Sequence, residues 1–122
     1  MLEFQDFEEK TIHRKEIFHG NIIDVCVDEV QLPDGSQSQR ELVFHPGGVA
    51  IIAITDEDKM VFVKQFRKPL ESVILEIPAG KIDPGENIHP LTTGQRELEE
   101  EVQLQAKEWE LVAQMYLSPG FA

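Results

Sequence analysis

The spacing of apolar residues in the first third of the chain predicts β-strands. Apolar and polar residues partly alternate in Thr11–His19 and again in Asn21–Leu32, and β-branched residues are common in both stretches. Leu32-Pro33-Asp34-Gly35 is a turn sequence, because proline presets φ and glycine accepts a positive φ. Gln39–Phe44 supplies a third alternating stretch. We therefore expect a small antiparallel sheet of three strands, which needs another surface to cover it.

A cluster of residues that break helices and strands, His45-Pro46-Gly47-Gly48, follows this sheet. Such clusters mark the boundaries of structural elements. We place a domain boundary here, and expect an N-terminal β-sheet in residues 1–45 and a second domain in residues 46–122.

The second domain opens with Val49–Ile54, a continuous apolar run of the kind found in strands buried on both faces. Thr55–Lys59 then turns the chain and Met60–Val63 returns it, which predicts a hairpin within a mixed sheet. Further strands are expected over Ser72–Ile77 and Trp109–Leu117.

The segment that begins at Pro90 predicts an amphipathic helix, because proline suits a first helical turn. At about 100° per residue, its apolar face is formed by Leu91, Leu98 and Val102. Its carboxylate face is formed by Glu97, Glu100 and Glu101. Each like-charge contact there disfavours the helix by roughly 0.2–0.5 kcal/mol, and Arg96 offsets about one of them. Two interpretations follow: a site for a divalent cation such as Mg²⁺, which takes oxygen ligands, or a solvated acidic face.

Composition limits the partners of the chain. Its 122 residues are 41% hydrophobic and 28% charged, as in soluble globular proteins. The net charge of −12 argues against nucleic acid and anionic membranes as partners. Cys26 is the single cysteine and lies in an apolar run, so we expect an inert strand residue in a reducing compartment. No apolar run has membrane-spanning length and the N-terminus is acidic, so we expect a cytoplasmic protein.

Basic residues are concentrated in Lys64–Pro69, within an otherwise acidic chain. The planar guanidinium of Arg67 can hold a phosphate with two hydrogen bonds. The alternative is a solvated strand end with ordinary salt bridges. Glu76 is the one charged residue of its predicted strand and is expected to be paired, with Arg67 and Arg96 both plausible partners.

The segment Gly80–Leu104 resembles the Nudix box, G-x5-E-x7-R-E-U-x-E-E-x-G-U, in which U is a bulky aliphatic residue. Gly80 and Glu86 match its first half. The second half is matched by Arg96, Glu97, Leu98, Glu100, Glu101 and Leu104. Two positions depart from the pattern. Nine residues instead of seven separate Glu86 from Arg96, and Gln103 stands where the family has a glycine.

This resemblance implies an α/β fold of the α+β type, the Nudix α/β/α sandwich with a mixed sheet. Here the sandwich is expected to be incomplete, because family members continue beyond the point where this chain stops. The pattern of residues 1–45 is similar to the N-terminal sheet of the ADP-ribose pyrophosphatase branch, which packs across a homodimer. A proline about sixteen positions beyond the box glycine also marks that branch, and Pro119 lies sixteen residues after Gln103.

The function implied by the resemblance is hydrolysis of the diphosphate of ADP-ribose or a related ADP-sugar, giving AMP and a sugar phosphate. Mg²⁺, with Mn²⁺ as a substitute, would be held by the carbonyl of Ala79 and by Glu97, Glu100 and Glu101. Arg96 belongs to the same catalytic group. Substrate contacts are expected from Arg40, Arg67, Glu76 and Pro119.

Two alternatives remain open from the sequence. The chain is a Nudix hydrolase of another nucleoside diphosphate derivative, or a non-enzymatic Nudix module that binds a metal or a partner without turnover. The longer box, Gln103 and the early stop favour the non-enzymatic module for these 122 residues.

Overall fold

The computed structural model describes residues 1–84 and 89–122. These residues divide into two compact units, one made of Met1–His45 with Ala113–Ala122, the other of Pro46–Val112. The chain passes from the first unit to the second within the breaker cluster, whereas Ala113–Ala122 belongs with the first unit. Within the described residues, no helix is both long and apolar enough to cross a membrane.

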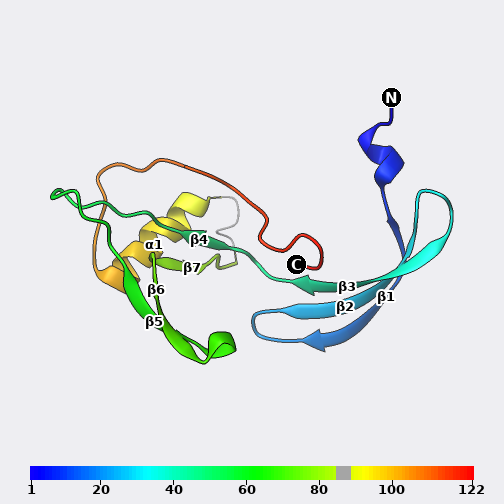
Figure 1. Cartoon of the computed structure of the whole chain (residues 1–122), viewed down its shortest axis with the longest axis horizontal. Coiled ribbons are helices and arrows are strands. Elements are labelled where there is room, and N and C mark those ends of the chain that lie inside the picture. Colours follow the sequence, from blue (N-terminus) through cyan, green and yellow to red (C-terminus); the bar gives the residue numbers. More distant parts are fainter. Residues whose placement is uncertain (85–88) are drawn as a thin grey trace. The chain divides into compact units, whose positions relative to one another are not determined.

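The first unit is built on an antiparallel sheet of three strands in the order β1-β2-β3 (Figure 1). These strands are β1 (Lys10–His19), β2 (Asp24–Gln31) and β3 (Gln37–Phe44), and a short 3₁₀ helix, η1 (Phe4–Phe7), precedes them. Between β2 and β3 the N–H of Gly35 donates to the carbonyl of Leu32 over 2.9 Å, and Gly35 has a φ of 84°. The predicted sheet and its turn are confirmed.

The central strand β2 carries the buried side chains of this unit. Cys26, Asp28 and Val30 are only 5%, 1% and 4% exposed. Because side chains alternate along a strand, these three residues share one face. Cys26 is buried as expected, whereas the burial of Asp28, a carboxylate at the centre of the same row, was not predicted.

The described residues of the second unit combine an α-helix with two antiparallel strand pairs (Figure 1). Strand β4 (Gly48–Ala50) pairs with β7 (Ala79–Lys81), and β5 (Val63–Arg67) pairs with β6 (Ser72–Glu76) through the 3₁₀ turn η2 (Lys68–Leu70). The helix α1 (Pro90–Val102) packs against β4 and β7. Where we expected one mixed sheet, the described residues form two separate antiparallel ladders.

The apolar run Val49–Ile54 is a strand only at its start. Ile51 is 6% exposed but Ile52 is 55% exposed, so alternate side chains face inward and outward. The expectation of burial on both faces is therefore wrong for the described structure. The predicted hairpin is present in a minimal form, since Ile54 forms a bridge with Met60 and the N–H of Val61 donates to the carbonyl of Ala53 over 2.9 Å.

The strand expected over Trp109–Leu117 is absent from the described structure. Leu111, Tyr116 and Leu117 are 76%, 87% and 87% exposed. β-propensity produces a strand only where a neighbouring strand satisfies its backbone groups, and this segment belongs to no ladder.

Helix α1 has the two ends that its sequence predicts. Pro90 occupies the first turn, and Gln103 ends the helix in the left-handed conformation with φ 57° and ψ 35°. The N–H of Gln103 donates to the carbonyl of Glu99 over 3.0 Å, and that of Leu104 to Leu98 over 3.4 Å. The first of these is the five-to-one bond of an αL cap, in which the N–H of the left-handed residue bonds to a carbonyl of the last helical turn. A residue with a Cβ therefore adopts the left-handed conformation that glycine accepts without strain.

Candidate metal and phosphate site

The carboxylate face of α1 meets strand β7 at Gly80. A Cβ placed on Gly80 would lie 1.9 Å from Cδ of Glu97 and 2.1 Å from its Oε1, which is impossible. The absence of a side chain at this position therefore admits the Glu97 carboxylate against the backbone of β7. The Glu97 side chain is only 13% exposed there.

Arg96 connects this carboxylate with its neighbours. Its Nη1 donates to Glu97 over 2.8 Å and to Glu100 over 3.0 Å, as the i,i+4 spacing predicted for the second contact. Its Nη2 donates to the carbonyl of Lys81 over 3.1 Å and lies 3.3 Å from a carboxylate oxygen of Asp83. Sequence reasoning missed the role of Asp83, although its position three residues after Gly80 puts it in the loop that leaves β7.

The third glutamate of the face contacts the same strand. The N–H of Ala79 donates to Oε2 of Glu101 over 3.2 Å. Strand β7 and the face of α1 thus bring Ala79, Glu97 and Glu101 together, with Glu100 joined through Arg96. Glu86, the remaining carboxylate of the box, lies outside the described residues.

These groups fit a hard divalent cation by their chemistry. Every predicted donor is an oxygen, from three carboxylates and one backbone carbonyl, as Mg²⁺ and Mn²⁺ prefer. In the parts of the chain that the structure describes, no three acidic, histidine or cysteine side chains already converge on one point. Instead, Arg96 is hydrogen-bonded to both Glu97 and Glu100, and the backbone N–H of Ala79 is bonded to Glu101.

Arg67 and Glu76 form a bidentate ion pair on the β5–β6 hairpin. Nε and Nη2 of Arg67 each donate to one oxygen of Glu76 over 2.8 Å. This contact settles which of the two arginines is the partner of Glu76. The hydrogen bonds from Arg67 hold the pKa of the Glu76 carboxyl below its ordinary value. In turn Glu76, and more weakly the negative charge of Glu101, raise the pKa of Arg67.

Arg40 and Pro119 belong to the first unit. Nε and Nη2 of Arg40 donate to the two carboxylate oxygens of Glu9 over 2.8 Å and 2.7 Å. Pro119 lies in a C-terminal turn in which the N–H groups of Phe121 and Ala122 both donate to the carbonyl of Ser118. The structure therefore shows Arg40 in an ion pair and Pro119 in a turn. The substrate contacts expected of both residues stay predictions.

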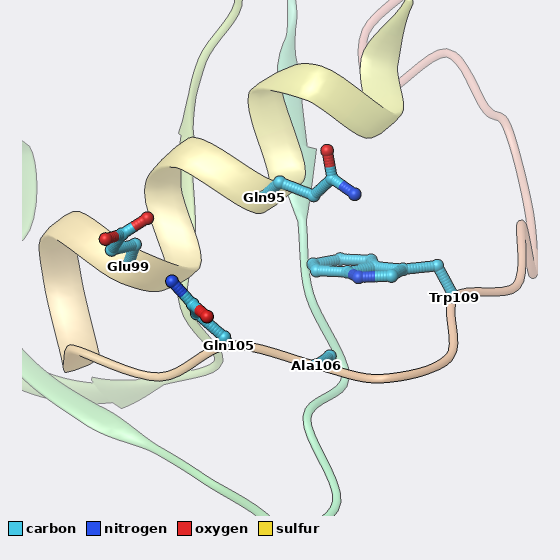
Figure 2. A pocket seen from close by; sticks show the side chains of 5 residues that line it. All are labelled: Gln95, Glu99, Gln105, Ala106 and Trp109. Carbon is cyan, nitrogen blue, oxygen red and sulfur yellow. The ribbon is translucent and has the colours of Figure 1, made fainter.

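A hollow of about 240 Å³ lies beside α1, lined by Gln95, Glu99, Gln105, Ala106 and Trp109 (Figure 2). At about 100° per residue, Glu99 projects roughly 160° away from Glu97 around the helix axis. The hollow therefore lies away from the carboxylate face of α1, and we do not assign it to the candidate metal and phosphate site.

Comparison with known families agrees with this arrangement. Residues 44–121 match the model of the NUDIX domain. Residues 9–43 match the model of the nucleoside diphosphate sugar hydrolase N-terminal domain.

Relatives cover nearly the whole chain. It is 53% identical to "ADP-ribose pyrophosphatase" of Bacillus subtilis over 97% of its length, and 53% identical to "Methanol dehydrogenase activator" of Bacillus methanolicus over 95%. It is 39% identical to "ADP-ribose pyrophosphatase" of Mycobacterium tuberculosis over 96% of its length. The chain spans 63%, 62% and 55% of these three relatives, respectively.

A solved structure, "Crystal structure of ADP compounds hydrolase", superposes with a TM-score of 0.80 over 93% of this chain and 61% of its own length. At 22% sequence identity this match shows the fold alone. The match confirms the expected α+β fold, in which strands are combined with a helix. On the match of residues 44–121 together with these relatives, the chain belongs to the Nudix family.

Proposed function

We propose that the protein hydrolyses the diphosphate of ADP-ribose or a related ADP-sugar with the help of Mg²⁺ or Mn²⁺. Water adds across the P–O–P linkage, so that one P–O bond breaks, another forms, and AMP and a sugar phosphate leave. The observation that carries this proposal is the approach of two carboxylates to β7, with Glu97 seated over Gly80 and Glu101 bonded to Ala79, while Glu100 is joined to Glu97 through Arg96.

The metal would be held by Glu97, Glu100, Glu101 and the carbonyl of Ala79. Bound there, it supplies charge neutralisation for the diphosphate and a water molecule of lowered pKa. Arg96 keeps Glu97 and Glu100 in place, because one guanidinium nitrogen contacts both carboxylates. Arg67 holds a phosphate through its planar fork, which offsets the net charge of −12 that repels an anionic substrate.

The test is release of AMP from ADP-ribose as a function of Mg²⁺ concentration. We expect Glu100→Gln to lower the rate by at least about a hundredfold, the scale of losing an electrostatic contact to the reacting group. It should also weaken Mg²⁺ binding measured by calorimetry. Glu99→Gln is the matched control, since it removes the same charge from the adjacent position on the other side of the helix. Equal effects of the two variants would contradict the assignment of the carboxylates.

A second candidate function is metal binding without turnover. It is favoured by the box sequence, which has two residues more than the family pattern between Glu86 and Arg96 but keeps the spacing of Glu97, Glu100 and Glu101. Calorimetric Mg²⁺ binding together with no AMP release above the rate without protein would select this candidate. Turnover that depends on Mg²⁺ and on Glu100 would reject it.

We also propose that the protein is a cytoplasmic homodimer whose first unit forms the interface, with residues 1–45 and 46–122 as its two domains. The support is the set of apolar side chains left exposed on β1, since Ile12, Ile17 and Phe18 are 51%, 53% and 55% exposed. Sedimentation velocity tests it: Ile17→Lys should shift a dimer toward monomer, whereas Lys15→Glu should not.

A further inference from the structure

The geometry of the β5–β6 hairpin points to a role for Glu76 beyond charge balance. We propose that Glu76 is a positioning residue that fixes Arg67, so that the remaining edge of its guanidinium is presented to a diphosphate. This inference rests on the proposed function, because it concerns the same anionic ligand. It implies that the negative charge of Glu76, although it lies near an anion site, strengthens binding of the anion.

The pair is not formed by residues directly opposite each other. In the hairpin register Arg67 faces Ser72, whereas Glu76 faces Val63 at the far end of the ladder. Since paired residues share a face and side chains alternate, Arg67 and Glu76 lie on the same side of the hairpin. The arginine side chain must therefore run back along this face to reach the carboxylate, which selects an extended conformation.

The contact uses only one edge of the guanidinium. Nε and Nη2 each donate to a different oxygen of Glu76 over 2.8 Å. Among residues 1–84 and 89–122, no acceptor is bonded to Nη1 of Arg67. The N–H groups of Nη1 are thus left for a ligand, and Arg67 remains 42% exposed while Glu76 is 21% exposed.

The guanidinium of Arg67 also senses the carboxylate face. Glu101 is close enough to add to the rise in the pKa of Arg67, after the larger contribution of Glu76. The same Glu101 is bonded to Ala79. Arg67 therefore lies within electrostatic range of Glu101, one of the proposed metal ligands, so both groups would act on the same diphosphate.

Two effects of removing the Glu76 charge have opposite signs. If Glu76 only contributes negative charge, Glu76→Gln reduces repulsion and an anion binds more tightly. If Glu76 positions Arg67, the variant frees a long side chain with several rotatable bonds, and an anion binds more weakly because that ordering must now occur on binding. The direction of the change therefore decides between the two roles.

The experiment is calorimetric titration of the whole chain with the non-hydrolysable probe α,β-methylene-ADP in the presence of Mg²⁺. We expect Glu76→Gln to weaken binding by about tenfold. The matched control is Glu71→Gln, which removes a carboxylate from the same hairpin that pairs with Lys68 instead of Arg67. This control should leave affinity unchanged or slightly increased.

A second variant guards against misfolding of the first. Arg67→Lys keeps the charge but loses the fork, and should weaken binding to a similar extent. Both changes disrupt the same ion pair. The double variant should therefore bind the probe no more weakly than the weaker-binding single variant, which is the signature of coupled residues. Thermal unfolding of each variant shows that it is folded.

The outcomes separate the two proposals. If the unmodified chain does not bind the probe at all, the proposed diphosphate site fails. If it binds, but Glu76→Gln binds as tightly or more tightly, or the losses of the two single variants simply add, the positioning role of Glu76 is wrong and the site stands.

Discussion

The two units of the molecule contain the same kind of ion pair in two settings. In the first unit, Nε and Nη2 of Arg14 donate to the oxygens of Asp28 over 2.7 Å and 2.8 Å. In the second, Nε and Nη2 of Arg67 donate to Glu76 with nearly the same distances. Arg14 and Asp28 face each other across β1 and β2, whereas Arg67 reaches a residue at the far end of its ladder.

What surrounds each pair differs. The Asp28 side chain is 2% exposed, Thr11 donates a further hydrogen bond to it over 2.9 Å, and the Arg14 guanidinium lies 5.0 Å from the centre of the Phe44 ring. The Glu76 side chain is 21% exposed, and among the described residues no acceptor is bonded to Nη1 of Arg67. Arg14 itself is 47% exposed, so the enclosed member of the first pair is the Asp28 carboxylate. A buried carboxylate depends on its arginine because water cannot replace that partner, whereas an open pair holds a charged group ready for a ligand.

The largest effect that would test this contrast is on stability. Arg14→Leu leaves the Asp28 carboxylate buried without its cation, and we expect the unfolding temperature to fall by about 10 °C or more. Arg67→Leu should lower it by at most a few degrees, since water can solvate Glu76. Circular dichroism during heating at pH 7 measures both. A larger loss for Arg67→Leu would overturn the contrast.

Acidification tests the same pair without mutation. The hydrogen bonds from Arg14, with a smaller one from Thr11, hold the pKa of Asp28 below its ordinary value of 3.8. A lowered carboxyl pKa stabilises the folded state fully above the unfolded-state value, and this contribution is lost as the pH falls through the folded-state pKa.

The unfolding temperature should therefore be nearly constant above about pH 5 and fall below about pH 4. Glu9 and Glu76, whose pKa values are also lowered by their arginines, act in the same direction. Asp28→Asn should make the fall shallower than Asp34→Asn, because Asp34 is bonded only to its local turn. Equal slopes for the two variants would show that the Arg14–Asp28 pair does not dominate the loss of stability at low pH.

The next prediction concerns the second unit, at the contact between strand β7 and helix α1. Gly80→Ala places a methyl group on the Glu97 carboxylate, so either β7 or the side chain must move. We expect a loss of roughly 1–3 kcal/mol in unfolding free energy, together with weaker Mg²⁺ binding. Urea denaturation and calorimetry measure the two.

The control for this change is Gly120→Ala in the first unit. A Cβ added to Gly120 would meet no atom within 4 Å. Unfolding free energy and Mg²⁺ binding should both stay unchanged. Normal Mg²⁺ affinity in Gly80→Ala would mean that the close approach of Glu97 is irrelevant to the metal.

The smallest expected effect is at the end of α1. Gln103→Gly relieves a left-handed conformation that side chains disfavour, and should stabilise the second unit by about 1 kcal/mol. Gln105→Gly, just beyond the cap, should give no gain. Urea denaturation distinguishes them. Equal responses would indicate that the cap geometry carries no strain.

The features of the fold that sequence could predict are those with local causes. The three-stranded sheet follows from alternation and a proline-glycine turn, and the limits of α1 follow from Pro90 and from the helix cap at Gln103. The contact of Arg96 with Glu100 follows from helical spacing alone. Each depends on residues within a few positions of one another.

Long-range contacts were not predictable in the same way. The choice of Arg67 over Arg96 as partner of Glu76 depends on the register of β5 and β6. The seat of Glu97 over Gly80 requires the packing of a helix on a strand. The mistaken strand over Trp109–Leu117 has the same origin, since a strand is defined by its partner and not by its own residues. Two signals were missed: the inward row of Cys26, Asp28 and Val30, and the position of Asp83 three residues after Gly80.

Trp109 gives the chain an internal optical probe. Its indole approaches the backbone of α1 so closely that a Cβ on Gly94 would lie 3.3 Å from it, with Val49 3.5 Å from the same point. It is the single tryptophan among 122 residues. Intrinsic fluorescence therefore reports on the surroundings of α1, and it offers an unlabelled readout for testing the metal binding proposed for the glutamates of that helix.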